Sequence, residues 1–529
     1  MPRTFIVAGA IAIAMLPATR IAAQQHAHPT QTTEQLGTVD FKTSCAPEVA
    51  PEFNRAVALL HSFEFGASLR AFNAVIARDS TCAMAYWGLA LSHWVNPMAL
   101  NIRPAALLER GRDAARTARR LGGAATERER DYITAVGLLY DAYETRDQWS
   151  RVVAYEQAMS EIVVRHPTDT EAKIFHAIAL AASAPPTDKT YANQLKAGAI
   201  LESLLATQPE HPGIAHYIIH SYDVPALAGR AAAAARRYAD IAPSAAHALH
   251  MPSHTFTRVG MWQESINTNL RSMDVAAREG SWAEALHAAD YAMYAYLQSR
   301  NDSAARTILA RLPALAEQFD PDAVTGAAPG WAGVFALAAM PARYALERNA
   351  WREAADLKPA GSSVLHAEAL THFSNALGAS RSGDAARART AIDSLQAIGT
   401  RLAAKGEAYW AEQAAIATLT SQAWLDLAEG RRERALVNMR QAVDREEATE
   451  KSAVTPGPLA PARELLGDML LVLDRPAEAL AEYQTSLERE PNRYRSLVGA
   501  RNAAAAAGDH AAALRYEEKL ARITSRRSP

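Results

Sequence analysis

A charge excess of either sign is absent from this 529-residue chain. Its 55 lysines and arginines nearly balance its 57 aspartates and glutamates, and the formal net charge is −2. Recognition of nucleic acid or of an anionic membrane usually leaves a marked excess of basic residues. We therefore expect no nucleic-acid partner.

Long hydrophobic runs are almost absent as well. The first 25 residues, "MPRTFIVAGAIAIAMLPATRIAAQQ", combine a basic start at Arg3, an apolar run over residues 5–16 and small residues at Ala22 and Ala23. This pattern predicts a signal peptide over residues 1–23, cut after Ala23. The run is shorter than the roughly 20 apolar residues of a membrane span, and no other segment reaches that length. Because no cysteine follows the cut, we expect no lipid anchor. Because no run is long enough to span a bilayer, we also expect no membrane insertion. The signal peptide then predicts an exported protein, periplasmic or secreted.

Cysteine is scarce, with only Cys45 and Cys82 in the whole chain. In an oxidising compartment two cysteines can pair, whereas reducing compartments keep thiols free. Because an export signal favours the first situation, we expect a Cys45–Cys82 disulfide. The alternative is a pair of buried free thiols.

Familiar catalytic motifs are also missing. The chain has no P-loop, no GxSxG elbow and no CxxC pair. The "HYIIH" stretch carries Tyr217 where the HExxH metalloprotease motif has its glutamate. A hydrolase without a cofactor is therefore disfavoured, and whether the protein is an enzyme at all stays open.

Helix-forming patterns are what the chain has in abundance. From about residue 50 onward, apolar residues recur every three or four positions, which is typical of amphipathic helices. Alanine-rich runs such as "RAAAAARRYA" strengthen the prediction, because alanine loses no side-chain entropy in a helix. No segment alternates as a strand would, so the sequence predicts an all-α protein.

The predicted helices repeat. In "ARELLGDMLLVLDRPAEALAEYQTSLEREPN" (462–492), Gly467, Ala479, Tyr483 and Pro491 occupy positions 8, 20, 24 and 32 of a 34-residue frame. This pattern resembles the tetratricopeptide repeat, a pair of antiparallel helices. Small residues at positions 8 and 20 let the two helices approach, and the proline ends the second helix.

Weaker copies occur upstream, and Pro209 and Pro243, which end two of them, are 34 residues apart. The resemblance implies an α-solenoid of helical hairpins, a right-handed superhelix with a concave groove. We expect an extended segment at 24–49, an N-terminal array with a histidine-lined groove at 50–320, irregular hairpins at 321–455 and C-terminal repeats at 456–525. The stretches "CAMAYWGLALSHW", "HALHMPSHTFTRVG" and "TPGPLAPARELLGDML" are also similar to a group of secreted bacterial tetratricopeptide-repeat proteins of unknown function.

Histidines recur with the same period. His250 and His254 follow His216 and His220 by 34 residues, so both pairs occupy positions 5 and 9 of the frame. In the tetratricopeptide family, positions 2, 5, 9 and 12 of the first helix line the groove. The resemblance thus implies a partner-binding surface made of His216, His220, Asp223, His247, His250, His254, Arg258, His287 and Asp290.

A metal site is one hypothesis for these histidines. Residues four apart share a helix face, and imidazole binds Cu, Zn, Ni and Fe. We expect His216, His220, His250 and His254 as ligands, with His247 accessory. A metal-free groove that contacts a peptide, or histidines with purely structural roles, would explain the same pattern. Pro252 also lies inside the expected helix, where it could turn His254 away.

Two functions follow from these patterns. The first is an exported tetratricopeptide scaffold that binds a peptide or protein partner in its concave groove. The alternative is a metal-binding protein or metal-dependent enzyme that uses the groove histidines.

Overall fold

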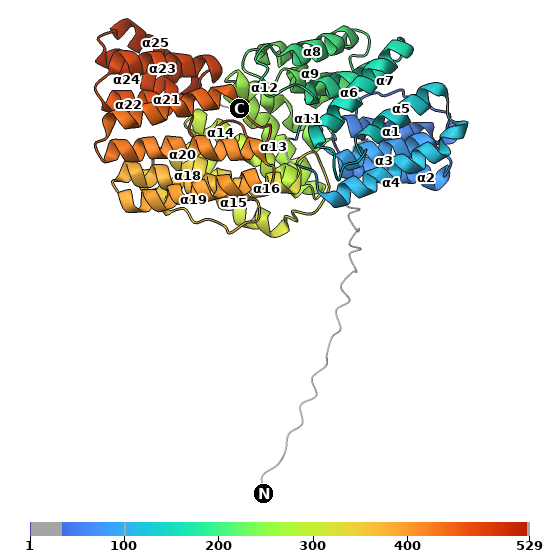
Figure 1. Cartoon of the computed structure of the whole chain (residues 1–529), viewed down its shortest axis with the longest axis horizontal. Helices are drawn as coiled ribbons and strands as arrows, with labels where there is room; N and C mark the ends of the chain where they lie inside the picture. The colour runs from blue at the N-terminus through green and yellow to red at the C-terminus, as the bar shows by residue number, and fades with distance from the viewer. Residues whose placement is uncertain (2–33, 100–101, 526–529) are drawn as a thin grey trace. The chain divides into compact units, whose positions relative to one another are not determined.

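The computed structural model describes residues 1, 34–99 and 102–525. The predicted signal peptide therefore lies, apart from Met1, outside the described residues. Within the described ranges the regular structure is entirely helical and includes no strand (Figure 1). None of these helices is both long and apolar enough to cross a lipid bilayer.

The first half of the described chain contains short and medium-length helices. In order these are α1 (Ala50–His61), α2 (Phe65–Arg78), α3 (Ala83–Trp94), α4 (Ala105–Leu121), α5 (Glu127–Leu138), α6 (Gln148–Arg165), α7 (Thr170–Ala182), α8 (Ala192–Leu205), α9 (Pro212–Ser221), α10 (Ala232–Ile241), α11 (Ala246–His250), α12 (Pro252–Arg258) and α13 (Trp262–Arg278). Three short 3-10 turns, Pro47–Val49, Gly122–Ala124 and Ala228–Ala231, precede or link them.

The second half of the described chain contains the remaining helices. They are α14 (Trp282–Gln298), α15 (Asp302–Gln318), α16 (Gly330–Glu347), α17 (Trp351–Asp356), α18 (Leu365–Ser382), α19 (Ala385–Ala404), α20 (Ala408–Ala428), α21 (Arg432–Ala448), α22 (Ala462–Val472), α23 (Pro476–Arg489), α24 (Tyr494–Ala506) and α25 (His510–Thr524).

The helices stack as successive pairs. α1 packs against α2 and also against α3, α18 against both α19 and α20, and α22 against both α23 and α24. Contact with the next helix and with the next but one is what a solenoid of helical hairpins produces. The described chain is thus an α-solenoid of tetratricopeptide-like hairpins, as the sequence predicted.

Small residues make the close helix contacts possible. A Cβ atom added to Gly467 would lie 2.8 Å from the ring of Tyr483, and one added to Gly88 would lie 2.2 Å from the ring of Phe72. Each glycine therefore leaves the space that an aromatic side chain of a neighbouring helix fills. The structure shows why the repeat pattern demands a small residue at these positions.

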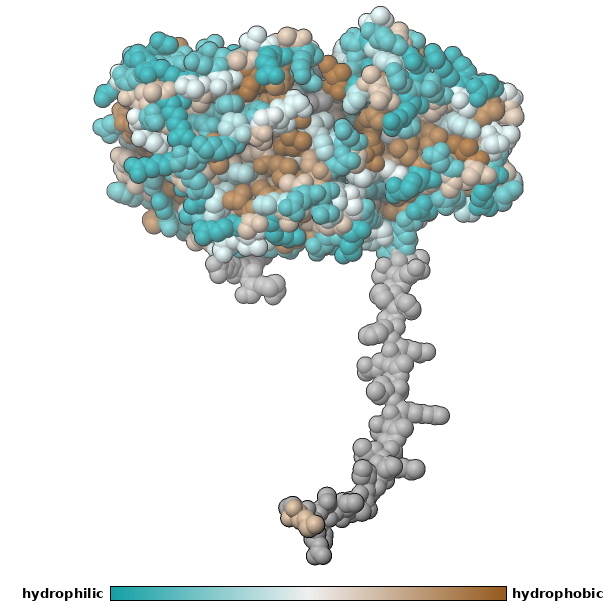
Figure 2. All heavy atoms as spheres, turned by 90° about the horizontal axis from the view of Figure 1, so that it is seen from below, coloured by the Kyte–Doolittle hydropathy of each residue, from teal (hydrophilic) through white to brown (hydrophobic). Residues whose placement is uncertain are grey.

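Two large hydrophobic cores divide the helices between them. One is built from residues between Leu36 and Phe256 together with Ala327, and the other from residues between Ala283 and Leu520. Smaller clusters are formed by residues of α13–α16 between Trp262 and Tyr344, a range that overlaps the second core in sequence. Figure 2 shows one face of the molecule, on which hydrophilic residues surround scattered hydrophobic patches.

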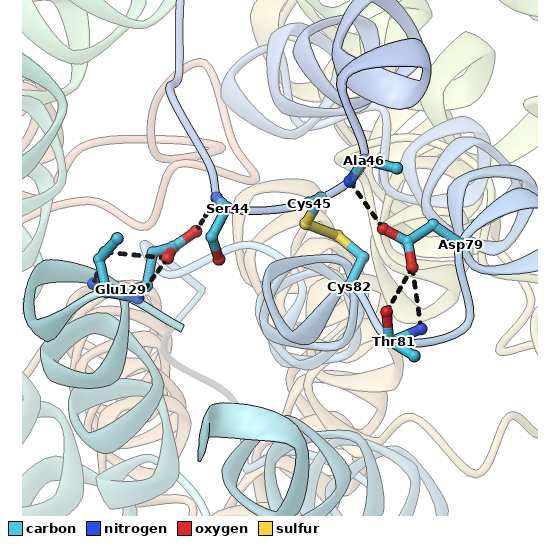
Figure 3. The surroundings of a disulfide bond; sticks show 8 residues. Ser44, Cys45, Ala46, Asp79, Thr81, Cys82 and Glu129 are labelled. Atoms are coloured by element: carbon cyan, nitrogen blue, oxygen red, sulfur yellow. Dashed lines mark hydrogen bonds between the residues drawn. A yellow bond between two sulfur atoms is a disulfide. The ribbon is translucent and has the colours of Figure 1, made fainter. Parts of the chain in front are cut away.

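The segment before α1 has no regular structure over residues 34–46 and is tied to the first helices. The N–H of Thr38 donates to the carbonyl oxygen of Glu210, and the ring of Phe41 packs on Trp87 and Tyr132. Cys45 and Cys82 form a disulfide with their Cα atoms 4.8 Å apart (Figure 3).

The segment between α21 and α22 lines two pockets. Residues 449–461, which we call the strap, run without regular helix from the end of α21 to the start of α22. The guanidinium of Arg343 donates to the carbonyl oxygen of Gly457 and to Oγ1 of Thr455. Asp290 pairs with Arg343 at 3.0 and 3.2 Å, and both side chains are fully buried. The strap is therefore anchored to α14 and α16 by a buried ion pair.

Candidate metal centre

Six histidines from four helices meet in the interior of the described chain. α9 carries two of them, α11 two, and α12 and α14 one each. Their rings lie next to one another, with neighbouring centroids 4.4 to 6.4 Å apart. All are buried, the most exposed only to 6%. This six-histidine cluster consists of His216, His220, His247, His250, His254 and His287.

Pro252 does not turn His254 away. It is the first residue of α12, where its missing N–H costs nothing, and Met251 before it has helical φ and ψ of −53° and −37°. The N–H of His254 donates to the carbonyl oxygen of Met251. The chain therefore stays helical through the junction, and Nε2 of His254 lies 3.0 Å from Nε2 of His250.

The cluster divides into two groups of three. His216, His220 and His247 form the first group, and His250, His254 and His287 the second. In each group, one ring nitrogen per histidine lies within 4.8 Å of the other two. Ligand nitrogens of one ion are roughly 3–4 Å apart when metal–nitrogen distances are roughly 2.0–2.1 Å. Small side-chain rotations would thus bring each group onto one ion.

Hydrogen bonds fix which nitrogen carries the proton in two histidines of the first group. Nδ1 of His216 lies 2.6 Å from the carbonyl oxygen of His61, and Nδ1 of His247 lies 2.9 Å from Oε1 of Glu284. Both oxygens can only accept, so each Nδ1 is the N–H donor and each Nε2 keeps its lone pair. Among the described residues, Nε2 of His216, His220 and His247 has no hydrogen-bond partner although it is buried.

The second group is fixed in the same way. The amide nitrogen of Asn269 donates to the carbonyl oxygen of Ser265, so its Oδ1 is the atom 2.7 Å from Nδ1 of His250. Nδ1 of His254 lies 2.9 Å from Oδ2 of Asp223. Both Nδ1 atoms therefore donate, and the two Nε2 atoms present lone pairs to each other at 3.0 Å.

Facing lone pairs repel unless a cation binds both. For a metal ion roughly 2.05 Å from each Nε2, the nitrogen–metal–nitrogen angle would be about 95°, which is an ordinary angle between two ligands. A shared proton is disfavoured, because burial lowers the pKa values of both His250 and His254. The second group thus has the geometry of two ligands of one ion, with Nδ1 of His287 as a third nitrogen that has no hydrogen-bond partner in the described chain.

Electrostatics keep the imidazoles ready to bind a metal. Burial first, and the neighbouring imidazoles second, hold four pKa values well below the ordinary value: those of His216, His220, His250 and His287. Neutral imidazole is the form that ligates metal ions.

The two carboxyl groups that accept hydrogen bonds from the imidazoles are ionised. Burial alone would raise the pKa of Asp223, but the charges of Lys451 and Arg258 outweigh it and hold that pKa well below its usual range. Burial would likewise raise the pKa of Glu284, and the charge and hydrogen bond of His247 lower it instead, to about 2. Carboxylates behind metal-ligating histidines fix the ring orientation and make the ligand nitrogen more basic.

A pocket of about 430 Å³ reaches the cluster from the side. Four of the six histidines line it, together with Asn96, Trp331 and strap residues 452–454. Nearby, Oη of Tyr291 lies 2.9 Å from the carbonyl oxygen of Ala453, and its ring packs against those of His250 and His254. The strap therefore forms part of the wall of this pocket.

Another histidine group nearby differs in one instructive respect. Glu171 lies between His61 and His211, 3.0 Å from Nε2 of each. Nδ1 of His61 is 3.0 Å from Oη of Tyr217. Both ring nitrogens of His61 thus have partners, as is typical of a structural histidine, whereas Nδ1 of His211 has none among the described residues.

The structure changes three expectations about the predicted residues. His247 and His287 belong to the three-histidine groups as fully as the four expected ligands, so the expected four-histidine site becomes two groups. Asp290 lies apart from the histidines, because it pairs with Arg343. The histidines are also buried beneath neighbouring helices and the strap, so a peptide on an open groove would not reach them.

Asp223 and Arg258 do accompany the cluster. The guanidinium of Arg258 donates to Oδ1 and to the carbonyl oxygen of Asp223, which in turn accepts from His254. These two predicted groove residues therefore act behind a histidine and not on a groove surface.

The sequence interpretation missed several residues behind the imidazoles. Glu284 could have been found, because it lies 34 residues after His250 and so again takes position 5 of the frame. Asn269, Lys451 and the carbonyl of His61 carry no comparable signal, since only the packing of distant helices brings them to the cluster.

Comparison with known proteins adds little. No model of a known protein family matches the chain, and no curated protein matches it. Among solved structures, a human IFIT1 dimer with m7Gppp-AAAA is 13% identical with a TM-score of 0.40, covering 84% of this chain and 90% of its own. Yeast Tom70 is 12% identical with a TM-score of 0.33, covering 90% and 98%. The APC/C hetero-tetramer Cut9–Hcn1 is 10% identical with a TM-score of 0.33, covering 90% and 93%. Similarity this low supports no conclusion about function.

Proposed function

We propose that the protein binds transition-metal ions at the six-histidine cluster, one ion in each group of three. The observation that carries this proposal is the pair of Nε2 lone pairs of His250 and His254, 3.0 Å apart, with both Nδ1 protons committed to Asn269 and Asp223. Buried polar atoms without partners are costly. A bound cation removes that cost at both groups.

The donor set selects the kind of metal. Six imidazoles suit Cu, Zn, Ni or Fe, whereas Mg, Ca and Mn favour oxygen ligands. The nearest carboxylates, those of Glu284 and Asp223, are bonded to ring nitrogens and so lie behind the ligands. Three histidines with a free coordination position are found in metal centres that bind a further ligand, as in catalytic zinc sites. The adjoining pocket supports access of such a ligand to the centre.

Metal content of protein purified without a His tag tests the proposal. We expect two equivalents of Cu, Zn, Ni or Fe in the wild type, one in His216→Ala or His250→Ala, and none in the double variant. The matched control is His510→Ala, because His510 is exposed at the start of α25 and should leave the metal content unchanged. Metal-free wild-type protein that gains no thermal stability from any of these ions would refute the proposal, since a ligand of the native state must stabilise it.

We also propose that the protein is exported. The support is the signal-peptide pattern of residues 1–23 and the Cys45–Cys82 disulfide, which persists only outside reducing compartments. Mass spectrometry of the protein recovered from the periplasm or medium should give a chain that starts at Gln24. Full-length protein confined to the cytoplasm would contradict this.

Binding of a peptide or protein partner along the solenoid stays a prediction. Because the histidines are buried, they cannot contact a peptide on the surface of the solenoid. The exposed residues of the helices would form the contact surface instead.

A further inference from the structure

A second pocket lies on the other side of the strap, in the C-terminal half. It encloses about 1310 Å³, including the space at its mouth, and receives side chains from α16, α18, α20, α21 and α23. We call it the C-terminal pocket. Its size is sufficient for a small organic molecule.

One wall of the C-terminal pocket is aromatic. The ring of Trp410 is stacked on that of His366 at a centroid distance of 4.2 Å and an interplanar angle of 10°. Phe335 lies 5.8 Å and Tyr409 4.9 Å from Trp410. Such a wall takes an apolar body, and it attracts a cation through the ring faces.

Carboxyl groups from three different segments line the same pocket. Glu446, at the end of α21, accepts the N–H of Ala462, its one hydrogen-bond donor in the described chain. Glu490 follows α23, and its buried Oε2 has no hydrogen-bond partner among the described residues, with Nε of Arg493 at 3.5 Å. Oε2 of Glu450 in the strap is buried and equally lacks a described donor. Oε1 of Glu450 accepts from Lys189 and Tyr191, so the oxygens left without a donor among the described residues are Oε2 of Glu450 and Oε2 of Glu490.

Most of the cations of this lining are committed elsewhere. Arg463 holds both oxygens of Glu447, at 2.6 and 2.8 Å. Arg258 holds Asp223, and Nζ of Lys451 forms an ion pair with the same carboxylate at 3.5 Å but has no hydrogen-bond partner among the described residues. Arg489 is the remaining base, with no ion pair within 4 Å among the described residues.

Burial is the main cause that raises the pKa values of two of these carboxyls. Burial raises the pKa of Glu446 to about 8, the nearby Glu490 and Glu447 add to this effect, and Arg489 and the N–H of Ala462 counter it only in part. Burial also raises the pKa of Glu490. A cation placed between the two groups would let both ionise.

We propose that the C-terminal pocket binds a small organic ammonium ion with an aromatic body. Its –NH₃⁺ group donates to the carboxyls of Glu446 and Glu490, and its ring packs against the aromatic wall at Trp410. An ammonium group brings three donors, which matches the unfilled acceptors of the pocket. The site is separate from the six-histidine cluster and does not depend on bound metal.

Three probes with the same body and different charge test the proposal. Isothermal titration at pH 7 compares 2-phenylethylamine, which is cationic, with 2-phenylethanol, which is neutral, and phenylacetate, which is anionic. We expect binding of the amine with quenching of tryptophan fluorescence, at least tenfold weaker binding of the alcohol, and none of the acid. Equal binding of amine and alcohol would overturn the proposal. So would the absence of amine binding at about 10 mM, a concentration tenfold above a dissociation constant of about 1 mM.

Matched variants locate the binding site. Glu446→Gln and Glu490→Gln should each weaken amine binding about tenfold or more. Because its raised pKa leaves Glu446 largely protonated at pH 7, glutamine is a close substitute and folding should be retained. Glu488→Gln, an exposed change near the end of the same helix α23, is the control and should bind the amine as the wild type does. Unchanged amine affinity in both pocket variants would exclude this pocket as the site.

Metal dependence is checked separately. The His216→Ala/His250→Ala variant should bind 2-phenylethylamine with wild-type affinity whether or not the metal proposal holds. Loss of amine binding in this folded variant would contradict a separate site.

Discussion

At the scale of residues, the hydrogen-bond partner of one ring nitrogen of a histidine decides whether the other nitrogen is free to bind a metal ion. In His61 both nitrogens have partners in the described chain. In His216, His247, His250 and His254, Nδ1 is held by an oxygen that can only accept, so the lone pair of Nε2 is directed into the cluster. The residues behind the ligands therefore decide the chemistry of the ligands.

The acceptor of His250 provides a direct test. Asn269→Leu removes the Oδ1 that fixes the Nδ1 proton of His250, and we expect metal affinity to fall about 10- to 100-fold. Competition with a chelator of known affinity measures the change. Asn269→Asp keeps an acceptor for Nδ1 and should lose less. Equal affinity of Asn269→Leu and wild type would show that the tautomer of His250 does not matter for binding.

A second residue-scale prediction concerns His366, which lies away from the cluster. Burial lowers its pKa to about 3, against the ordinary value of 6.5. Between these values the unfolded chain binds a proton that the folded chain does not, so this histidine makes stability fall as pH drops below 6.5, by up to about 1.4 kcal/mol per pH unit.

Replacing His366 by phenylalanine removes this dependence while preserving the stack on Trp410. Urea unfolding at pH 6.5 and 5.5 should show that the variant loses about 1 kcal/mol less than the wild type over this interval. Identical losses would mean that His366 does not titrate as its burial requires.

At the scale of elements, the helical hairpins depend on residues small enough to admit a ring from a neighbouring helix. Gly88 and Gly467 occupy such positions. The break between α11 and α12 at Met251 and Pro252 shows that a local irregularity need not disturb a helix face, because the residues on both sides keep helical dihedrals.

Two glycines give opposite outcomes on the same substitution. Gly88→Ala would place a Cβ 2.2 Å from the ring of Phe72, so we expect a loss of about 1–3 kcal/mol of unfolding free energy. Gly137→Ala, in α5, meets no atom within 4 Å and should be neutral or stabilising by up to about 1 kcal/mol. Urea unfolding measures both, and a Gly88→Ala protein as stable as the wild type would contradict the packing described.

At the scale of the whole molecule, the strap connects distant parts of the chain. It lines the pocket beside the histidines on one side and the C-terminal pocket on the other. Its anchor is the buried pair of Asp290 and Arg343, of which Arg343 also bonds Thr455 and Gly457.

Breaking this anchor should be costly. Arg343→Met leaves the carboxylate of Asp290 buried without its partner, and we expect a loss of about 3–5 kcal/mol of unfolding free energy. Asp290→Leu combined with Arg343→Met removes both charges and should restore part of that loss. A double variant no more stable than Arg343→Met would show that the buried charge is not the source of the cost.

The sequence alone determined the helices, their pairing and the period of the histidines. These features are local or strictly repeated: helix faces follow from three- and four-residue spacing, and a 34-residue period carries His216 to His250 and then to Glu284. The expected groove surface was wrong for the histidines because burial depends on which distant segments cover a face, and no local pattern records that. Only the tertiary structure brought His61, Asn269 and the strap to the cluster, and with them the acceptors that decide which nitrogen of each imidazole remains free.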